Sequence, residues 1–380
     1  MPFKELTIRG YECQNDRAQV EDLERRCKVG PSQSVLDAMG DPMCRIRNSP
    51  MCIMLVAEED NELVGVIQGS IKMVTVHNHP PKDMAKVGYV LGLRVAPYSR
   101  RKGIGSSLVQ KLEEWFISND VDYAYVATEK DNHASINLFM NKFGYIKFRT
   151  PTILINPVNH HSFPISSNIE IARVKVEKAE SLYRNFMGSI EFFPSDIENI
   201  LRNKLSLGTW VACFKGDSDF GPDGQVPNSW AMLSVWNSGE IFKLRLGKAP
   251  PSCLLCTKSW NLIGRIFPCL KLATLPNFFS PFGFYFMYGV YQEGPFSGKL
   301  VRALCKFVHN MASKKSEHCK IIVAEVGGRD ELNHHVPHWK LLSCPDLWCI
   351  KALKNEGTGM FHELTTNTPP KALFVDPREV

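Results

Sequence analysis

A short basic segment with two glycines is the part of this sequence best suited to binding an anion. It runs Arg100-Arg101-Lys102-Gly103-Ile104-Gly105, after a strand-like stretch that ends at Val95 and at the start of a helix-like stretch. The first N–H groups of a helix have no partner within the helix, and the helix dipole adds partial positive charge there. Glycines leave the backbone open to a ligand, while basic side chains supply mobile charge. The segment therefore predicts a site for a phosphate or pyrophosphate group.

Two common nucleotide-binding patterns are missing from this segment. A dinucleotide site carries G-x-G-x-x-G, and an ATP-binding P-loop ends in G-K-[ST]. Residues 100–108 contain neither pattern. A nicotinamide or ATP site is therefore not expected, and the anion must belong to another kind of ligand.

The elements that position this segment are predicted by hydrophobic periodicity. Strands are expected at 6–9, 53–58, 63–71, 87–95, 122–128 and within 145–155, and helices at 20–27, 106–117 and 134–142. The runs 53–58 and 63–71 are joined by a short polar connection, so they should form an antiparallel hairpin. This first half is predicted to be mixed α/β.

The second half of the chain repeats the order of these elements. Strands are expected at 169–176, 209–213, 230–236, 284–291, 321–325 and 347–353, with a helix at 299–312 and a long insertion before residue 284. Val126 follows Leu93 by 33 positions, and Val323 follows Val290 by the same number. A divergent duplication is a plausible interpretation. The segment 292–298, where a second anion loop would fall, contains an acidic residue and a proline, so no cofactor is expected there.

A segment rich in proline, histidine and serine separates the two halves. It occupies residues 157–168 of the 380-residue chain, which exceeds the usual size of one domain. We therefore expect a first domain at 1–156, a linker at 157–168 and a second domain at 169–380.

Charge and hydropathy exclude several classes of protein. The net charge is +6, without a long run of lysine and arginine, so no direct binding to DNA is expected. The first fifteen residues are mixed and polar, and no apolar run of about 18 residues occurs. We expect an intracellular, soluble protein without a membrane segment.

The cysteines and histidines predict no metal site. The twelve cysteines are spread along the chain, several of them in apolar stretches, and are expected to be reduced core residues. Cys253 and Cys256 have the spacing of metal ligands, but no second Cys/His pair follows at zinc-finger distance. His334, His335 and His338 surround a proline and are expected in a surface loop.

A second motif follows the basic segment at about 30 residues. It runs Asn132-His133-Ala134-Ser135-Ile136-Asn137-Leu138-Phe139, with Phe143-Gly144-Tyr145 beyond it. Together with R-x-x-G-x-G after Leu93-Arg94-Val95, it resembles the GNAT (Gcn5-related) N-acetyltransferase superfamily over about residues 4–155. The whole chain resembles the plant Hookless-type probable N-acetyltransferases, in stretches that include 89–95, 204–209, 337–340 and 374–379.

The resemblance implies a GNAT acyl-CoA N-acyltransferase fold of mixed α/β type, with a second, degenerate GNAT-like domain. It implies acetyl-CoA as co-substrate, with its pyrophosphate on the backbone of residues 101–106, its pantetheine arm against the edge of 93–95, and Asn132 beside that arm. The implied cofactor-binding residues are Leu93, Arg94, Val95, Arg100, Arg101, Lys102, Gly103, Ile104, Gly105, Ser106 and Asn132. The amine acceptor would belong to a protein or peptide, with histones as one candidate.

The catalytic positions depart from the family pattern. Phe139 stands where many members carry a tyrosine acid, and Ala127 where some relatives carry a base. Neither side chain can transfer a proton. Glu129, at the carboxyl end of the same strand as Ala127, is the candidate base. A non-catalytic acetyl-CoA-binding regulator or scaffold is the alternative from another class, and a small-amine acetyltransferase is a third.

The Hookless-type resemblance also implies a biological setting. It implies a regulator of plant development that links ethylene, auxin and light to differential growth such as the apical hook. The expected location is the nucleus, with the cytoplasm as a second location. The sequence leaves the acceptor and the oligomeric state open.

Overall fold

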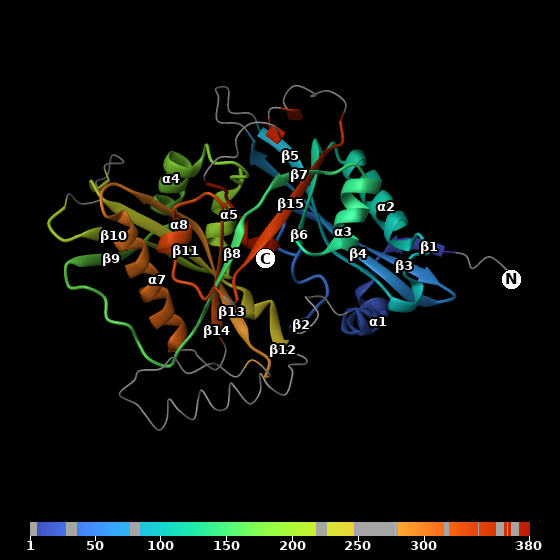
Figure 1. The fold of residues 1–380 in the computed structure, drawn as a ribbon, viewed down its shortest axis with the longest axis horizontal. Helices are drawn as coiled ribbons and strands as arrows, with labels where there is room; N and C mark the ends of the chain where they lie inside the picture. The colour runs from blue at the N-terminus through green and yellow to red at the C-terminus, as the bar shows by residue number, and fades with distance from the viewer. Residues whose placement is uncertain are drawn as a thin grey trace.

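The computed structural model describes most of the chain. The main feature of the fold is one extended mixed sheet with helices on both faces (Figure 1). The described residues are 6–27, 36–76, 84–217, 226–246, 278, 280–314, 319–340, 342–354, 361–362, 364–365 and 372–380. Cys253 and Cys256 lie outside them. The mixed α/β architecture predicted from the sequence is confirmed.

The N-terminal half contains the following elements: β1 (Leu6–Gly10), α1 (Cys13–Arg26), β2 (Leu36–Gly40), β3 (Met51–Glu59), β4 (Glu62–Thr75), β5 (Met84–Val95), the 3-10 turn η1 (Pro97–Ser99), α2 (Ile104–Ser118), β6 (Tyr123–Glu129), α3 (His133–Ile136), the π-helical turn η2 (Asn137–Lys142), β7 (Ile146–Arg149) and β8 (Thr152–Pro157). The helix predicted at 20–27 begins earlier. Its first turn is held by Asp16, which accepts the Glu12 N–H at 2.8 Å and pairs with Arg9.

The C-terminal half contains β9 (Ile169–Val174), α4 (Val176–Met187), α5 (Ile197–Arg202), β10 (Ser206–Phe214), β11 (Trp230–Asn237), η3 (Ser238–Glu240), β12 (Phe242–Leu246), β13 (Gly283–Glu293), α7 (Ser297–Ser313), β14 (Cys319–Val326), α8 (Leu332–His335), β15 (Cys344–Ala352) and η5 (Pro377–Glu379). The strand predicted at 169–176 ends at Val174, because Val176 already begins α4. A small separate sheet pairs β12 with β2.

The large sheet contains the same strand arrangement twice. Its order is β1-β3-β4-β5-β6-β15-β8-β14-β13-β11-β10-β9, with β7 paired to β15. In each half one neighbouring pair is parallel, β5 with β6 and β13 with β14, and the other neighbours named in this order are antiparallel. The C-terminal half thus repeats the strand order of the N-terminal half.

The last strand of each half pairs with the other half. β15 pairs with β6 along its length, from Asp346 opposite Glu129 to Ala352 opposite Tyr123. β8, which precedes the expected linker, pairs instead with β14. Figure 1 shows β15 in red and β8 in green, running between the two halves. The domain limits expected from the sequence stay a prediction. Each half contributes one strand to the sheet of the other half, β8 beside β14 and β15 beside β6.

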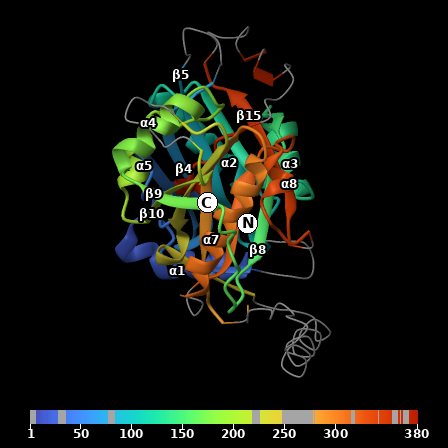
Figure 2. The ribbon, with the colours of Figure 1, turned by 90° about the vertical axis from the view of Figure 1, so that its left-hand side faces the viewer.

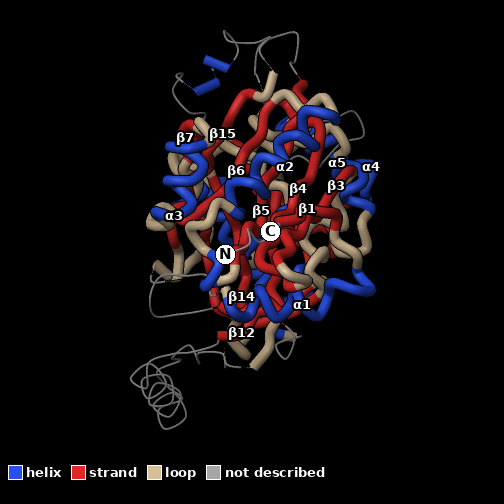
Figure 3. The backbone as a smooth tube through the Cα atoms, turned by 90° about the vertical axis from the view of Figure 1, so that its right-hand side faces the viewer, coloured by secondary structure: helices blue, strands red, loops and turns tan. Residues whose placement is uncertain are grey.

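Helices cover both faces of the sheet and bury two cores. In the C-terminal half, α4 and α5 pack into the larger core and α7 into the smaller one (Figure 2). In the N-terminal half, α2 lies over β3, β4 and β5, and α1 contacts β4 and β5 (Figure 3). The residues between β8 and β9 run along α7, where the Asn159 N–H donates to His309 Nε2 at 2.9 Å.

A cluster of buried charges fixes the last residues of the chain beneath β4. Lys72 Nζ lies 2.8 Å from Glu379 Oε1 and 3.5 Å from Asp376 Oδ2. Arg378 pairs with Asp376 and with Asp196 at 2.7 Å each. The Tyr125 hydroxyl donates to the Glu379 carboxylate. These contacts bring residues 374–380 to the centre of the molecule.

Candidate functional site

The two parallel strands of the N-terminal half separate at their carboxyl ends. β5 and β6 pair from Val87 opposite Tyr123 to Val90 opposite Val126, and no further. Just beyond, Gly92 and Leu93 together oppose Ile67 of β4 and form a β-bulge, with Gly92 at φ +64°. The bulge turns β5 away from β6 and leaves one edge of its backbone without a strand partner.

A cavity of about 310 Å³ opens at this separation. Its walls come from β5, β6, the turn at α3, strands β8, β14 and β15, and the last residues of the chain. The lining residues are Arg45, Tyr89, Val90, Leu91, Gly92, Leu93, Arg94, Val126, Ala127, Thr128, Glu129, Asn132, Ser135, Phe139, Ile153, Glu325, Asp346, Trp348, Val375, Glu379 and Val380. Both halves of the chain therefore build the cavity.

The basic segment forms the loop between β5 and α2, as predicted. Arg101 has φ +63° and Gly103, the residue before α2, has φ +93°, with no atom within 4 Å of the position a Cβ would take. Within the described part of the chain, no hydrogen-bond acceptor lies opposite the amides of residues 101–106. Several N–H groups at the start of a helix are thus without a partner in this part of the chain, and such groups can bind a diphosphate.

The structure brings only some of the predicted site residues to the cavity itself. Leu93, Arg94, Glu129 and Asn132 line it. Val95 ends β5, residues 100–103 lie in the loop that follows, and residues 104–106 begin α2. The Asn132 side chain accepts the Ser135 N–H at 3.2 Å and caps α3. Glu129 is exposed at the end of β6.

The arginine and lysine side chains of this region are held differently. Arg94 Nη1 donates to the Leu93 carbonyl at 2.9 Å, and burial lowers the pKa of its guanidinium. Arg100 Nε donates to the Val95 carbonyl at 3.3 Å, and Lys102 Nζ lies 3.7 Å from Glu59. Arg100 and Lys102 are exposed and can reorient toward a bound anion.

The two departures from the family pattern both face the cavity. Phe139 is 3% exposed, and its ring packs edge-on against Tyr145 with a centroid distance of 5.3 Å. Ala127 of β6 stands opposite Trp348 of β15. Neither position offers a group that can gain or lose a proton.

Sequence reasoning missed two acidic residues of the C-terminal half that line the cavity, Glu325 and Asp346, which together we call the acidic wall. Burial and the nearby Asp346 carboxylate raise the pKa of Glu325 to about 8, although Trp348 Nε1 donates to Glu325 Oε1 at 3.1 Å. Burial also raises the pKa of Asp346 to about 6. The available signal was a charged residue, Glu325, in the otherwise apolar stretch 321–326.

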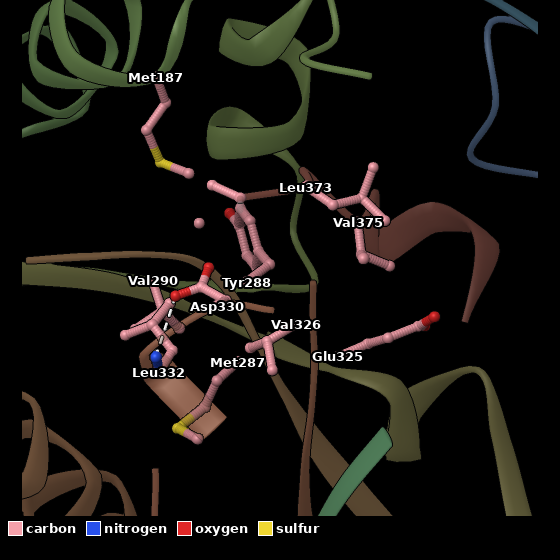
Figure 4. Close-up of a pocket in the computed structure, with 12 residues that line it drawn as sticks. Met187, Met287, Tyr288, Val290, Glu325, Val326, Asp330, Leu332, Leu373 and Val375 are labelled. Atoms are coloured by element: carbon pink, nitrogen blue, oxygen red, sulfur yellow. Dashed lines mark hydrogen bonds between the residues drawn. The ribbon is translucent and has the colours of Figure 1, made fainter. Parts of the chain in front are cut away.

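The corresponding separation of β13 and β14 holds a much smaller cavity. Its volume is about 20 Å³, and Gly289 stands at φ +57° in a bulge like that of Gly92. Figure 4 shows Met187, Tyr288 and Leu373 crowding this space, with the Glu325 carboxylate turned away from Asp330. A space of this size is too small for a pantetheine arm. The expectation that this half binds no cofactor was based on Glu293 and Pro295 and stays a prediction.

The remaining sequence-based expectations concern cysteines, histidines and membranes. Nine cysteines among the described residues are not joined in disulfides; most of them are at least partly buried, although Cys13 and Cys344 are exposed. His334 and His335 end the short helix α8 instead of lying in a loop, and His335 Nδ1 is 2.8 Å from Gln292 Oε1. In the described ranges, no cluster of three or more His, Cys, Asp or Glu could hold a metal ion. No helix there is long and apolar enough to cross a membrane.

The separated parallel strands, the loop of free amides and the cavity between them define a CoA-dependent acyltransferase. Residues 17–145 match the Acetyltransferase (GNAT) family model. The chain belongs to this family of N-acetyltransferases, whose co-substrate is acetyl-CoA. It is 45% identical over 401 residues to "Probable N-acetyltransferase HLS1" of Arabidopsis thaliana, covering 98% of this chain and 99% of that protein.

Two further comparisons agree with this assignment. "Acetyl transferase GW6a" of Oryza sativa subsp. japonica is 33% identical over 418 residues, covering 98% of this chain and 97% of the relative. The structure of Saccharomyces cerevisiae N-myristoyltransferase with bound myristoyl-CoA superposes with a TM-score of 0.54 at 11% identity, over 93% of this chain and 80% of that one. The latter likeness concerns the fold alone.

Proposed function

We propose that this chain transfers the acetyl group of acetyl-CoA to a primary amine of a protein, on a lysine side chain or an N-terminus, with histones as one candidate acceptor. The observation that carries the proposal is the cavity at the separated ends of β5 and β6, which adjoins the unpartnered amides of residues 101–106. A protein or peptide acceptor is favoured because the cavity is built by both halves of the chain and is lined by acidic side chains.

The residues present fit acetyl-CoA. The amides of residues 101–106 and the positive end of α2 would hold its diphosphate, helped by Arg100 and Lys102. The unpaired edge of β5 beyond Val90 leaves backbone groups free to bond an extended arm. When bound, acetyl-CoA supplies an activated acyl group as a thioester. The protein orients the amine beside it, and orientation alone contributes a large part of such accelerations.

The biological setting is part of the same proposal. The full-length similarity to plant N-acetyltransferases supports a role as a regulator of plant development, in ethylene, auxin and light responses and in differential growth such as the apical hook. A protein acceptor such as a histone is compatible with a nuclear location, and we propose the nucleus as the main site of action. No direct contact with DNA or membranes is required.

A non-catalytic acetyl-CoA-binding regulator is the second candidate. The observation that favours it is Phe139, which occupies the position of the tyrosine acid and faces the cavity without a hydroxyl group. A protein of this kind would bind acetyl-CoA with the same loop but would acetylate no acceptor.

Calorimetric titration with acetyl-CoA tests the cofactor site. Gly103→Glu places a carboxylate where the diphosphate is expected, and binding should weaken by at least about tenfold, equal to about 1.4 kcal/mol. Gly216→Glu is a matched control. Gly216 also has positive φ, at +84°, and no atom within 4 Å of its Cβ position, but it lies in the turn after β10. This control variant should bind acetyl-CoA normally.

Release of the CoA thiol over a panel of lysine peptides, N-terminal peptides and histones then tests the transfer. Acceptor-dependent release that is lost in Gly103→Glu supports the enzyme. Binding without release for any acceptor supports the regulator. If wild-type protein binds no acetyl-CoA, or if Gly103→Glu and Gly216→Glu behave alike, the proposed cofactor site is wrong.

A further inference from the structure

The acidic wall of the main cavity lies on strands that the N-terminal half does not contain. Asp346 of β15 stands directly opposite Glu129 of β6. Glu325 of β14 stands opposite Ile153 of β8, and Ile153 also stands opposite Cys344 of β15. Residues that are opposite in register, or two apart on one strand, point to the same face of a sheet. Glu325, Asp346 and Glu129 therefore share one face, and all three line the cavity.

This arrangement is unfavourable for the protein by itself. Asp346 is 7% exposed, and Glu325 is half-buried and lines both cavities. Burial disfavours the charged form of both carboxylates and raises the pKa of each; the neighbouring Asp346 raises that of Glu325 further, and Glu129 that of Asp346. A cation bound between them would remove the cost.

The other charged groups around Glu325 do not supply that cation. Those that face it or its neighbours are Asp346 from β15, Glu129 from β6, Glu379 from the end of the chain, Arg45 from the segment before β3, Arg94 from β5 and Asp330 from the segment after β14. The Arg94 side chain donates to the Leu93 carbonyl at 2.9 Å. The Arg45 guanidinium donates to the Glu379 carbonyl at 3.3 Å, and Lys72 pairs with the Glu379 carboxylate. The region near Glu325 and Asp346 is therefore acidic.

We propose that Glu325 and Asp346 bind the ammonium form of the acceptor amine in this cavity, and that Glu325 takes its proton. The proposal rests on the proposed acetyl transfer, because it assigns the acceptor end of that same cavity. It places the proton acceptor in the C-terminal half, on β14, in place of Glu129, which is exposed at the rim.

The proton transfer is balanced between two groups. One N–H bond of the ammonium breaks and one O–H bond forms on Glu325, so the nitrogen gains a free electron pair and the carboxylate becomes a carboxylic acid. The acid then returns its proton to water. An ammonium beside Glu325 favours the carboxylate, so the base is charged when its substrate arrives. A base whose pKa lies near neutrality suits this exchange.

Trp348 provides a reporter for this site. Its indole N–H donates to Glu325, and the chain has seven tryptophans, so a spectrum of labelled indole N–H groups contains few signals. The Trp348 signal is assigned as the one that Trp348→Phe removes. In wild-type protein it should move with pH between about 6 and 8, following Asp346 and Glu325. In Glu325→Gln the part of this movement near pH 8 should be lost and the part near pH 6, due to Asp346, should persist. The other indole signals should stay in place, which shows that the variant is folded.

The probe for the acceptor is n-butylammonium chloride, with 1-butanol as its uncharged counterpart. At about neutral pH, butylammonium should shift the Trp348 signal of wild-type protein in a saturable way, and 1-butanol should not. Glu325→Gln and Asp346→Asn should abolish the shift. Glu170→Gln is the control, because Glu170 is exposed on the distant edge strand β9.

Transfer to a peptide accepted by the wild type completes the test. Glu325→Gln should lower kcat by at least about 100-fold and remove the acidic limb of the pH profile, whereas Glu170→Gln on the edge strand β9 should retain the wild-type rate. The proposal is overturned if butylammonium leaves the Trp348 signal unchanged, or if Glu325→Gln transfers at the wild-type rate with an unchanged pH profile. A wild type that binds butylammonium through Glu325 but acetylates no peptide would refute the proposed function and the proton transfer, and would leave the ammonium site standing.

Discussion

Replacing Lys72 by methionine is expected to destabilise the protein in a manner that depends on pH. The Lys72 side chain is 4% exposed and lies between the carboxylates of Asp376 and Glu379, which are 0% and 7% exposed. Asp376 keeps a second cationic partner in Arg378, but Glu379 has only Lys72 as an ion-pair partner among the described residues. Methionine fills a similar volume without charge, so the variant leaves Glu379 buried without its counter-ion.

The size of the effect follows from the cost of protonating Glu379. Burial raises its pKa above the ordinary value of 4.5, and Lys72 opposes that rise. Without Lys72, the folded protein can avoid a buried unpaired charge by keeping Glu379 protonated. This protonation lowers the free energy of unfolding by about 1.4 kcal/mol for each pH unit above 4.5, which sets an upper limit on the loss. The limit is therefore about 4 kcal/mol at about pH 7.5, and a loss of roughly 2 to 4 kcal/mol agrees with other broken buried pairs. Because the folded pKa is raised, the loss vanishes below 4.5 and grows as pH rises.

Urea unfolding followed by tryptophan fluorescence measures this loss, from the shift of the midpoint at constant slope. The double variant Lys72→Met/Glu379→Gln should recover much of the stability, because the glutamine needs no counter-ion. Lys111→Met is the surface control, since Lys111 is exposed and pairs only within α2. A loss below about 1 kcal/mol at about pH 7.5, or one that does not shrink toward pH 5, would refute this reasoning.

Three further predictions concern the two bulges and the cavity. Gly289→Ala should cost roughly 3 kcal/mol in urea unfolding, because its Cβ would lie 2.4 Å from Tyr183; Gly92→Ala, whose Cβ meets Gln68 at 3.3 Å, should cost about 1 kcal/mol. Phe139→Tyr should raise kcat about tenfold on an accepted peptide, and an unchanged kcat would show that no acid is needed. Trp348→Phe removes a donor to Glu325, so the acidic limb of the pH profile should move to higher pH.

Much of the fold was predictable from the sequence because strands and helices have their own periodicities. The hairpin of β3 and β4, the helix after the basic loop and the order of elements in the C-terminal half all follow from local patterns. The exchange of β8 and β15 was not predictable. The stretch 347–353 shows that a strand forms, but nothing in its alternation specifies β6 as its neighbour, more than 200 residues earlier in the chain.

The site divides in the same way. The loop at residues 100–106 was found because glycines, basic side chains and a following helix are neighbours in sequence. Glu325 and Asp346 were missed because their raised pKa values depend on burial and on neighbouring carboxylates. They come together through the pairing of β14 with β8 and of β8 with β15, which the sequence does not reveal. Glu129 was chosen as the base from its own strand, and the residue opposite it belongs to the other half. Its role remains a prediction that Glu129→Gln will decide.

The exchange of strands also constrains how the chain can fold during synthesis. When the ribosome has completed β6 and β7, the strand β15 that pairs with both of them is still about 200 residues away in the sequence. The sheet of the N-terminal half therefore has an unpaired edge until β15 is synthesised. Contacts between such distant residues form slowly and depend on the rest of the chain. The nascent protein therefore needs protection from aggregation until β15 emerges. An isolated fragment 1–156 lacks this strand and should not fold stably by itself.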